Sequence, residues 1–579
     1  MKPLDPQTLA QAEAHPAAPS MAAILVAVEA VSDLSQTRRR DLRSAVKAVA
    51  KVLDLPLAQI PADLSWLRVR LAKMHPAQLG ISAKRWVNIR SDLQAVFDVL
   101  GLRSYQRRRI KPNAAWQALL DRIHDKNIEY GVSRLARFCS RMNIAPDDVN
   151  AEVLEQLRVS LAEGSLLKDP DHTIRVIRSS WNRAVKKIPG WPQNTIAPPA
   201  RPDRFNLIFE DFPPSFRDDV DAFMAKMDGS DPFAEDSAPK PLAPATLKYR
   251  RQQIRRMASA LVLSGVPVDE VTGLDVLVTP DNVKRALRFL HDRREGPLSE
   301  DLHNLGVAMK VIAKHHVKGD AKTLENLKDI CRRVRPDVVG MTDKTRERLR
   351  QFDDDRNVAL LLHLPERLVA EAKKIRGRPR DAAVLMQMAL AVELLLFTEL
   401  RLKNLASLDL NQHFRWHRAS RAAVCHLVIE RTEVKNRQPL EFELMPDTVK
   451  LLKLYRDEYL PVLARGRSTY LFPGRSGEKP KSPENLSQQI KKTIRKYTGL
   501  TVHPHLFRHI GAKLYLDQNP GGYEVVRRVL GHASMDTTIR IYTGLETKSA
   551  AKHFDEEILK VRDRADAKRK ARLKRKPRP

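Results

Sequence analysis

Apolar residues recur at helical spacing along most of this chain, so most of its fold must be built from amphipathic helices. This spacing dominates until about residue 420, whereas alternation of the β type appears mainly between Val424 and Leu444. A chain of 579 residues is long enough for three or four domains, each with its own core. The sequence therefore predicts a mainly α-helical protein with a small β-sheet, divided into several domains.

Three N-terminal stretches look like variants of one helical unit. In each, a basic amphipathic helix ends at an apolar residue followed by Pro or Ala, with an aliphatic residue four positions later: Leu55-Pro56 with Ile60, Ile144-Ala145 with Val149, and Val266-Pro267 with Val271. Counting back from each of these pairs aligns one face of the preceding helix, at offsets i, i+3, i+4 and i+7. The three faces are formed by Val46, Val49, Ala50 and Leu53, by Leu135, Phe138, Cys139 and Met142, and by Met257, Ala260, Leu261 and Ser264. All but Ser264 are apolar, which predicts three related helical domains. Chance similarity stays open, because the pattern is short.

Proline separates the second unit from the third. The stretch from about Pro189 to Pro244 is rich in Pro and in charges of both signs, so it cannot form one continuous helix. The expected domain plan has seven parts: an N-terminal tail (1–35), a helical DNA-binding-like unit (36–106), a second helical unit (107–190), a Pro-rich linker (191–243), a third helical unit (244–340), a C-terminal domain with a final helix (345–564), and a basic disordered tail (565–579).

The charge of the chain indicates a polyanionic partner. Lys and Arg outnumber Asp and Glu by 102 to 70, a net charge of +32, and the last twelve residues contain eight Lys or Arg and no acid. Nucleic acid is the commonest such partner, although a basic membrane-surface protein or a polyanion scavenger also fits the charge alone. Aromatic residues make up only 6% of the chain, which argues against base-stacking binders of single strands or RNA.

Cysteine content and hydropathy favour the cytoplasm. The start of the chain carries no basic region followed by an apolar stretch and cleavage site, so export is not expected. The longest apolar run, at 382–397, contains two polar residues and is shorter than the roughly 20 residues that a bilayer requires, so we interpret it as a buried helix. A disulfide framework or zinc ribbon is not supported by the three widely spaced cysteines, Cys139, Cys331 and Cys425.

The C-terminal 200 residues contain the groups needed to break a DNA phosphodiester without a metal: a nucleophile, a base, cations and an acid. The strongest local pattern is His505-Leu506-Phe507-Arg508-His509, preceded by Pro504. Proline suits the first turn of a helix, so His505 and Arg508 are expected to share one helix face.

Further candidate catalytic residues lie on both sides of this pattern in the sequence. Leu530-Gly531-His532 comes next, and a helix that begins near Asp536 and ends before Gly544 would carry Tyr542 in its last turn. Upstream, Arg401 follows the buried helix. The segments 427–433 and 440–444 flank a turn that contains Lys435, and they are interpreted as a β-hairpin with this lysine at its tip.

The order of these residues resembles the catalytic pattern of the tyrosine recombinases, the phage integrase family, over roughly residues 350–560. The residues that carry the resemblance are Arg401, Lys435, His505, Arg508, His532 and Tyr542. The stretch from Leu530 to Tyr542 is similar to the family's most recognisable segment, and the third helical unit resembles its core-binding domain. The resemblance implies several helical, SAM-like core-binding-type domains followed by a tyrosine recombinase catalytic domain.

The chain departs from the family pattern near the first arginine. This motif usually has Gly where the chain has Glu399, and a Ser-Glu pair where it has Lys403-Asn404, while Arg401 itself is in place. Lys435 is one of several basic residues near the hairpin, and Arg437 lies two positions away. We take Lys435 as the lysine of the pattern.

The resemblance implies a mechanism with no cofactor and no metal. Arg401 and Arg508 hold the scissile phosphate, and Tyr542 attacks it to give a 3′-phosphotyrosine and a free 5′-hydroxyl. His505 accepts the phenol proton and Lys435 protonates the departing oxygen, while His532 bonds the phosphate or positions the tyrosine. The 5′-hydroxyl of a second strand then attacks the adduct without ATP.

The implied partners are double-stranded DNA and further copies of the chain. Residues 546–564 form an amphipathic stretch with Phe554, Ile558, Leu559 and Val561, which in relatives docks onto a neighbouring protomer, so a tetramer on two DNA sites is implied. Packing within the same chain stays open. Accessory directionality or DNA-bending proteins, a role in moving a mobile element, and a cytoplasmic, nucleoid-associated location are also expected.

Each candidate residue also has an ordinary interpretation. Alone, Arg401 would be a surface charge, Lys435 an exposed loop charge and Tyr542 a core aromatic, and His505 with His509 could be a metal pair, although no nearby Glu or Cys completes a site. Their joint occurrence favours the recombinase. A type IB topoisomerase, a telomere resolvase and a non-catalytic DNA-binding regulator remain as alternative functions.

Overall fold

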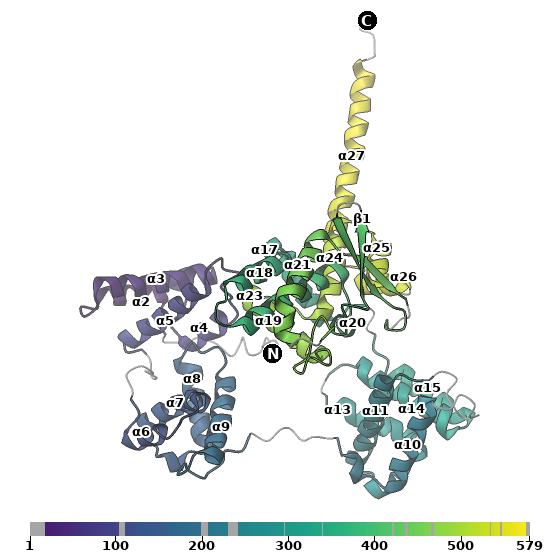
Figure 1. Ribbon diagram of the computed structural model, residues 1–579, viewed down its shortest axis with the longest axis horizontal. Helices are drawn as coiled ribbons and strands as arrows, with labels where there is room; N and C mark the ends of the chain where they lie inside the picture. Colours follow the sequence, from purple (N-terminus) through teal and green to yellow (C-terminus); the bar gives the residue numbers. More distant parts are fainter. Residues whose placement is uncertain are drawn as a thin grey trace. The chain divides into compact units, whose positions relative to one another are not determined.

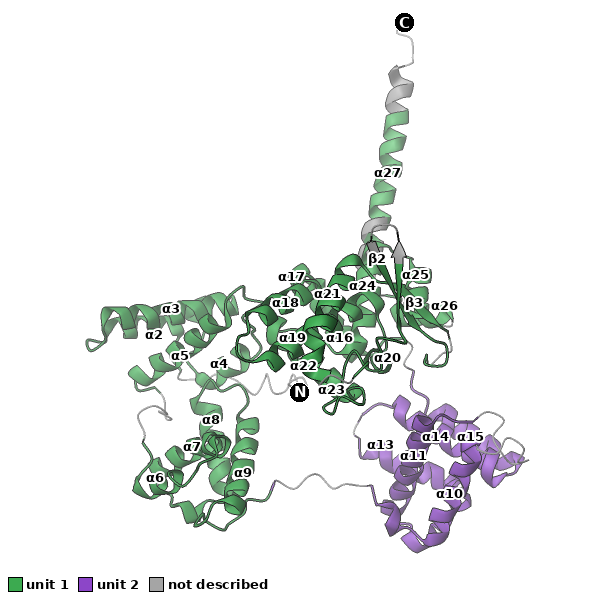
Figure 2. Cartoon of the chain, viewed as in Figure 1, with its two compact units in different colours: residues 1–197, 340–579 green, residues 198–339 purple. Residues whose placement is uncertain are grey.

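The computed structural model describes residues 18–102, 111–198, 206–229, 241–294, 296–337, 340–419, 422–434, 438–464, 468–532, 534–544 and 547–574. The chain divides into two compact units, one formed by residues 1–197 and 340–579 and the other by residues 198–339 (Figure 2). The described part is mainly helical with one three-stranded sheet, so the predicted fold class is confirmed.

The N-terminal part of the larger unit contains two groups of helices (Figure 1). The first group is α2 (Met21–Ala30), α3 (Gln36–Leu53), the 3₁₀ turn η1 (Leu57–Gln59), α4 (Leu64–Leu71) and α5 (Ala83–Val99). The second is α6 (Ala114–Leu120), α7 (Lys126–Arg141), η2 (Pro146–Asp148), α8 (Ala151–Gly164) and α9 (Pro170–Lys187). Each has its own core, which α3 and α5 share in the first and α7 and α9 in the second.

The smaller unit is helical throughout its described residues. Its elements are η3 (Phe209–Asp211), α10 (Pro214–Asp228), α11 (Pro244–Leu263), η4 (Val268–Glu270), α12 (Leu274–Leu277), α13 (Pro280–Asp292), α14 (Glu300–Ile312), the π-helical turn η5 (Ala313–Val317) and α15 (Ala321–Arg333). They enclose one continuous hydrophobic core.

The expected linker is wrong for residues 206–229, which belong to the smaller unit. Phe216, Val220 and Phe223 are buried along one face of α10 and pack against the core that includes α11. These positions follow the spacing i, i+4 and i+7 of a helix face. Pro213 and Pro214 stand at the start of the helix, where proline is tolerated, so they begin α10 rather than prevent it.

The two expected tails also differ from the structure. Helix α2 lies inside the predicted N-terminal tail, begins at the cap residue Ser20 and buries Met21, Ile24 and Val28, so it is part of the first core. At the other end, helix α27 (Thr547–Lys574) continues through ten residues of the predicted disordered tail. Residues 1–17 and 575–579 lie outside the described residues.

The remaining elements form the C-terminal domain of the larger unit. They are α16 (Asp343–Leu349), η6 (Arg350–Asp353), α17 (Asp355–Leu362), α18 (Leu364–Lys374), α19 (Pro379–Thr398), α20 (Leu402–Ala406), β1 (Phe414–Ala419), β2 (Ala422–Ile429), β3 (Leu440–Glu443), α21 (Pro446–Leu454), η7 (Tyr455–Tyr459), α22 (Leu460–Ala464), α23 (Pro483–Thr498), α24 (Pro504–Gln518), α25 (Tyr523–Leu530), α26 (Met535–Tyr542) and α27.

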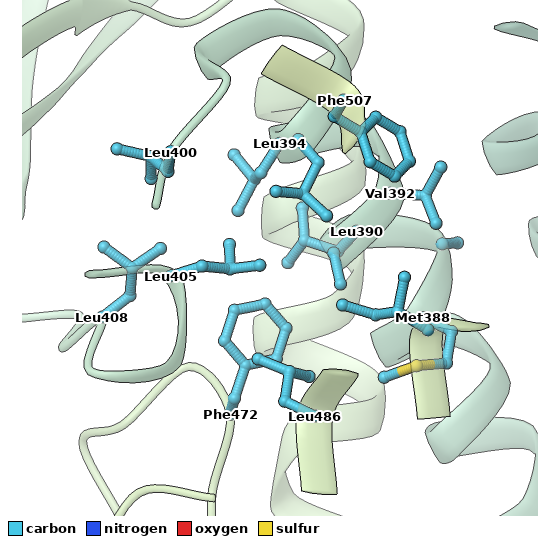
Figure 3. Packing of buried hydrophobic residues seen from close by; sticks show 14 of the residues in the cluster. Met388, Leu390, Val392, Leu394, Leu400, Leu405, Leu408, Phe472, Leu486 and Phe507 are labelled. Atoms are coloured by element: carbon cyan, nitrogen blue, oxygen red, sulfur yellow. The ribbon is translucent and has the colours of Figure 1, made fainter. Parts of the chain in front are cut away.

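Helix α19 forms the centre of this domain. It contacts α18, α21, α22, α23 and α24, and its side chains Met388, Leu390 and Leu394 pack among those of the surrounding elements (Figure 3). Among the described helices it alone is long and apolar enough to cross a membrane, and it is mostly buried in the protein. Because α19 packs against five other helices, its C-terminal end is a rigid place from which to present a functional side chain.

The sheet lies beside this helical core in the order β1-β2-β3, and both pairs are antiparallel. Phe414 pairs with Leu427, and Ile429 pairs with Leu440. The predicted hairpin is therefore present as β2 and β3, whereas the additional strand β1 was not predicted.

Candidate active site

The end of α19 positions Arg401. The helix stops because Glu399 adopts a left-handed conformation with φ 48° and ψ 33°, and Arg401 then precedes the short helix α20. Burial lowers the pKa of Arg401. Its buried Nη1 has no hydrogen-bond partner among the described residues. A guanidinium N–H that is desolvated and unpaired is suited to binding an anion.

Arg508 connects three sequence motifs. It lies on α24 and is only 4% exposed, and its Nη1 donates to the carbonyl of Glu399 at 2.8 Å while its Nη2 donates to the carbonyl of Leu530 at 2.5 Å. These carbonyls belong to the stretch that leads to Arg401 and to the Leu-Gly-His stretch. Burial and then the charge of Arg401 lower the pKa of Arg508.

Histidines line the same side of α24. Burial of the ring, followed by the positive charges of Arg508 and Arg401, lowers the pKa of His505. His509 lies one turn further, with its ring centre 5.2 Å from that of His505, and burial lowers its pKa to about 4. Both rings are therefore neutral at physiological pH and able to accept a proton.

Tyr542 ends α26, and its ring contacts those of two histidines. Its ring stacks on His532 with centres 6.4 Å apart and an interplanar angle of 10°, and its centre is 5.6 Å from that of His509. The phenol is 1% exposed and donates a long hydrogen bond of 3.5 Å to the carbonyl of Arg508. Burial raises the pKa of Tyr542, whereas the charge of Arg508 opposes this effect.

His532 is held in place by the helix that carries the tyrosine. Its Nδ1 lies 2.9 Å from Oγ1 of Thr538, which is fully buried on α26. Burial, with the charges of Arg508 and Arg401, lowers the pKa of His532 to about 4. The ring is therefore neutral, and its Nε2 is the atom left to bond a phosphate oxygen or the phenol.

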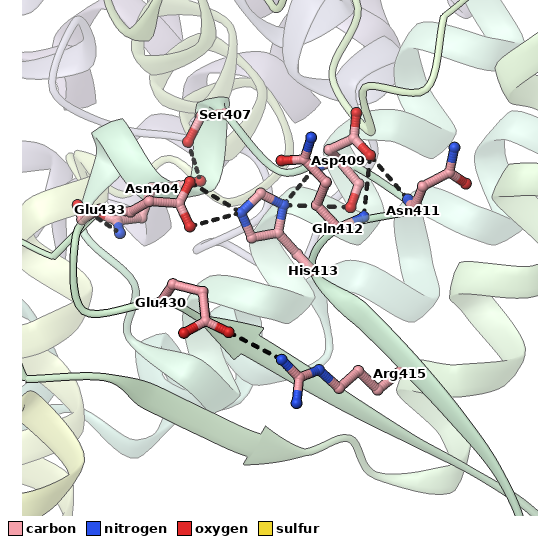
Figure 4. A network of polar contacts seen from close by, with 9 residues as sticks. All are labelled: Asn404, Ser407, Asp409, Asn411, Gln412, His413, Arg415, Glu430 and Glu433. Atoms are coloured by element: carbon pink, nitrogen blue, oxygen red, sulfur yellow. Dashed lines mark hydrogen bonds and ion pairs between the residues drawn. The ribbon is translucent and has the colours of Figure 1, made fainter.

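Lys435 lies outside the described residues, but the segment before it is described. His413 is 3% exposed and links two loops: its Nδ1 accepts from the backbone N–H of Asp409 at 2.9 Å, and its Nε2 lies 3.2 Å from both carboxylate oxygens of Glu433 (Figure 4). The backbone carbonyl of Glu433 also accepts from Nδ2 of Asn404 on α20, at 3.4 Å. These bonds connect α20, which directly follows Arg401, to the loop that follows strand β2.

The structure brings five of the six candidate residues into one cluster: Arg401, His505, Arg508, His532 and Tyr542. Sequence reasoning missed the contributions of Glu399, His509 and Thr538. His509 was considered only as a metal ligand, although its position four residues after His505 already placed it on the same helix face. Within the described ranges, no group of three or more His, Cys, Asp or Glu is arranged to hold a metal ion.

Solved structures to which this chain shows a weak likeness are recombinases of low sequence identity. XerH site-specific recombinase bound to its difH substrate is 16% identical with a TM-score of 0.34, and the match covers 53% of this chain and 79% of that one. The Tn1549 transposon integrase in complex with transposon right-end DNA is 14% identical with a TM-score of 0.34, covering 58% and 98%. Likenesses this weak carry no weight for the activity of the present chain.

Curated relatives match over a shorter stretch. Tyrosine recombinase XerC of Chromobacterium violaceum is 36% identical over 90 residues, which is 15% of this chain and 28% of that protein. XerC of Pseudomonas aeruginosa strain LESB58 is 30% identical over 101 residues, 17% of this chain and 32% of that protein. The match thus spans about a third or less of each relative.

The family model described as "Phage integrase family" matches residues 366–549. This range contains the five clustered residues and Lys435. The C-terminal domain of this chain is therefore similar, over residues 366–549, to the phage integrase family of tyrosine recombinases.

Proposed function

We propose that this chain is a site-specific DNA recombinase that cleaves and rejoins DNA strands through a 3′-phosphotyrosine at Tyr542. The observation that carries the proposal is the convergence of Arg401, Arg508 and Tyr542, which come from α19–α20, α24 and α26. A phenol beside two buried guanidinium groups fits nucleophilic attack on a phosphodiester better than it fits an ordinary core.

The two arginines bind the scissile phosphate. Their planar guanidinium groups match its nonbridging oxygens, and they stabilise the charge that accumulates as the phosphorus changes partners. Arg508 is held by two backbone carbonyls, so its orientation is fixed before DNA binds. The unpaired Nη1 of Arg401 supplies a further donor.

Proton transfer accompanies both bond changes. The Tyr542 oxygen forms a bond to phosphorus as its proton moves to the neutral ring of His505, and the 5′-oxygen leaves with a proton from Lys435. His532 bonds the phosphate or holds the phenol. In the second step a 5′-hydroxyl attacks the phosphotyrosine and restores the tyrosine, so one phosphoester replaces another and no external energy source is required.

Tyr542 must move before it attacks. Its side chain is 1% exposed and its oxygen faces the backbone carbonyl of Arg508. A phosphate on the protein surface cannot reach this oxygen, so α26 or the tyrosine rotamer has to change when DNA binds.

The partner that fits the charge is double-stranded DNA. Besides the net charge of +32, the smaller unit has a surface hollow to which α13 contributes Lys284, Arg285 and Arg288 together with Asp281 and Asp292. Cations gathered on one helix face can bind phosphates along a duplex regardless of base sequence. We propose that this unit and the two N-terminal helical units hold DNA, that the biological outcome is the movement of a mobile element, and that the protein acts on the nucleoid, with or without accessory DNA-bending proteins.

The test is covalent capture on DNA. The full chain is incubated with a library of nicked duplexes of random sequence, in which the short strand beyond the cleavage point diffuses away and leaves the adduct trapped. Denaturing gels then measure protein attached to DNA 3′ ends. We expect an adduct with the wild-type chain, none with Tyr542→Phe, and a wild-type amount with Tyr497→Phe, a tyrosine on α23 outside the cluster.

The same experiment separates the alternatives. A non-catalytic regulator gives DNA binding without any adduct and without a difference on Tyr542→Phe. A type IB topoisomerase relaxes supercoiled plasmid without needing a particular site, and a telomere resolvase leaves hairpin ends. Exchange of strands between two copies of a captured sequence supports the recombinase.

A further inference from the structure

Glu399 is an unexpected residue at the junction between α19 and Arg401. The described residues other than glycine that have positive φ are Asp54, Asn143, Lys318 and Glu399, and only Glu399 is buried. A residue with a Cβ adopts this conformation at a cost in free energy, which is why helix ends of this kind usually carry glycine. The chain therefore retains a carboxyl group where a glycine would be easier to accommodate.

The facing helix leaves space for this carboxyl group. The carboxylate of Glu399 lies against the Cα of Gly511 on α24, and a methyl group added at Gly511 would overlap with it. Glu399 is 7% exposed, so its carboxyl is enclosed by the domain rather than directed to solvent. Glu399 and Gly511 thus form a complementary pair of large and small residues between two elements of the active site.

Charged and titratable groups face Glu399 from two helices. Arg508 of α24 donates to the backbone carbonyl of Glu399 and interacts electrostatically with the Glu399 carboxylate. The charge of this carboxylate also acts on Tyr542 of α26. Arg401 lies two residues along the same stretch. The other titratable groups of the cluster are His505, His509 and His532, whose pKa values are already low.

The protonation state of this carboxyl changes near neutral pH. Burial raises the pKa of Glu399 to about 8, and the charge of Arg508 opposes the rise. Below this pH the carboxyl is neutral and the two arginines present their full charge. As pH rises through the pKa, a negative charge appears next to Arg508 and offsets part of its attraction for a phosphate.

We propose that Glu399 is a positioning residue whose buried carboxyl, packed on Gly511 beside Arg508, sets the positive charge that the two arginines present to the scissile phosphate. The inference rests on the proposed function, because it concerns the same phosphate site. A bound phosphate and an ionised Glu399 repel each other, so DNA binding and protonation of Glu399 favour one another. Cleavage therefore weakens on the alkaline side of the pKa.

The experiment compares Glu399→Gln with the wild-type chain. Glutamine keeps the shape of the side chain and cannot ionise. Rates of adduct formation on a nicked duplex captured as above are measured in single turnovers from roughly pH 6.5 to pH 9.5. Near pH 7 the two rates should be similar. If only the protonated form binds the phosphate, the ratio of variant to wild-type rate should rise by about tenfold between pH 7 and pH 9, because the wild-type carboxyl ionises over this range.

Glu393→Gln is the matched control. Glu393 lies on α19, the helix that Glu399 ends, and burial also raises its pKa. Its carboxylate accepts from Thr448 at 2.8 Å and is not one of the charges that act on Arg508. Its variant should follow the wild-type pH profile. Glu399→Gly removes the carboxyl and relieves the backbone, so it should give the same profile as Glu399→Gln and serves if the glutamine variant does not fold.

A binding measurement keeps the two proposals separate. Affinity for the same duplex is measured with Tyr542→Phe, alone and combined with Glu399→Gln, at about pH 7 and about pH 9. From the lower to the higher pH, the affinity of Tyr542→Phe for the duplex should fall several-fold more than the affinity of the double variant. Equal losses, or rate profiles of Glu399→Gln and wild type that coincide, would overturn the role of Glu399. Absence of any adduct with the wild-type chain, together with a binding difference, would instead overturn the recombinase.

Discussion

Glycine at position 511 provides the space that the Glu399 carboxylate occupies, and this contact allows a stability test. Substitution Gly511→Ala places a methyl group where the carboxylate lies. Overpacking of a buried contact typically costs about 1–3 kcal/mol. The thermal unfolding midpoint of the full chain, followed by calorimetry, should therefore fall on Gly511→Ala.

A second substitution, Glu399→Gly, tests whether contact with the Glu399 carboxylate causes the loss of stability in Gly511→Ala. Glu399→Gly removes both the side chain and the strain of the left-handed conformation, so alone it should stabilise the protein by about 1 kcal/mol. In the double variant the alanine no longer meets a carboxylate, and most of the loss should be recovered. If the double variant is as unstable as Gly511→Ala, the methyl group collides with something other than Glu399.

For single side chains, the sequence predicted that the five described candidates lie together but not how they are held. Spacing alone placed His505 and Arg508 on one helix face and Tyr542 at the end of its helix. It could not predict the bond from Arg508 to the carbonyl of Glu399, because that partner is 109 residues away along the chain. Nor could it predict that Glu399 is buried, since burial depends on the facing glycine of a distant helix.

Among the elements, His413 fixes the loop that leads from strand β2 toward Lys435. His413→Ala removes the acceptor for the Asp409 N–H and the donor to Glu433 (Figure 4). An unsatisfied buried polar group costs about 1–3 kcal/mol. We expect hydrogen exchange, measured by mass spectrometry on peptides covering β2 and β3, to become faster because the segment opens more often.

Arg415 offers a control from the same sheet. It forms an ion pair with Glu430 at 2.9 Å, but the two side chains are 57% and 61% exposed (Figure 4). Exposed ion pairs contribute little to stability, so Arg415→Ala should leave exchange in β2 and β3 nearly unchanged. Equal acceleration by both variants would mean that the sheet responds to any substitution and that His413 has no special role.

The same succession of elements recurs in the three helical units, which is why the sequence alone could indicate them. Helices α3, α7 and α11 are each followed by a residue with positive φ, namely Asp54, Asn143 and Gly265, and then by a 3₁₀ turn. Most of the aligned apolar positions are buried, whereas Met142 is exposed; the buried ones are Val46, Val49, Leu135, Phe138, Cys139, Met257, Ala260 and Leu261. Local spacing was sufficient here because each unit buries its face within its own short segment.

Elements that depend on distant partners were harder to predict. Strand β1 was missed because apolar and polar residues alternate only over the first four positions of its sequence Phe-Arg-Trp-His-Arg-Ala, and its partner strand β2 was needed to identify so short a run. Helix α10 was taken for linker because the prolines around it outweighed its apolar face. In both cases composition was a poorer guide than the positions of a few apolar residues.

For the whole molecule, helix α27 carries exposed apolar side chains that the described part of the chain does not cover. Phe554, Ile558 and Val561 are 65%, 53% and 60% exposed and follow the spacing i, i+4 and i+7. A stripe of this kind on a long charged helix costs solvation free energy unless a partner covers it. We propose that a second copy of the chain covers it when several copies assemble on DNA.

Assembly on DNA can be measured by sedimentation velocity, with the captured duplex and without it. Burial of a Phe or Ile side chain contributes about 1.5–3 kcal/mol, so replacing Phe554 and Ile558 together with serine should weaken assembly by about 100-fold or more while leaving binding of a single chain to DNA intact. The control is Asp563→Asn, on the opposite face of α27, which should assemble as the wild type does. If the serine variant still forms the wild-type complex but its thermal midpoint falls, the stripe packs within its own chain, and contacts between copies must come from another surface.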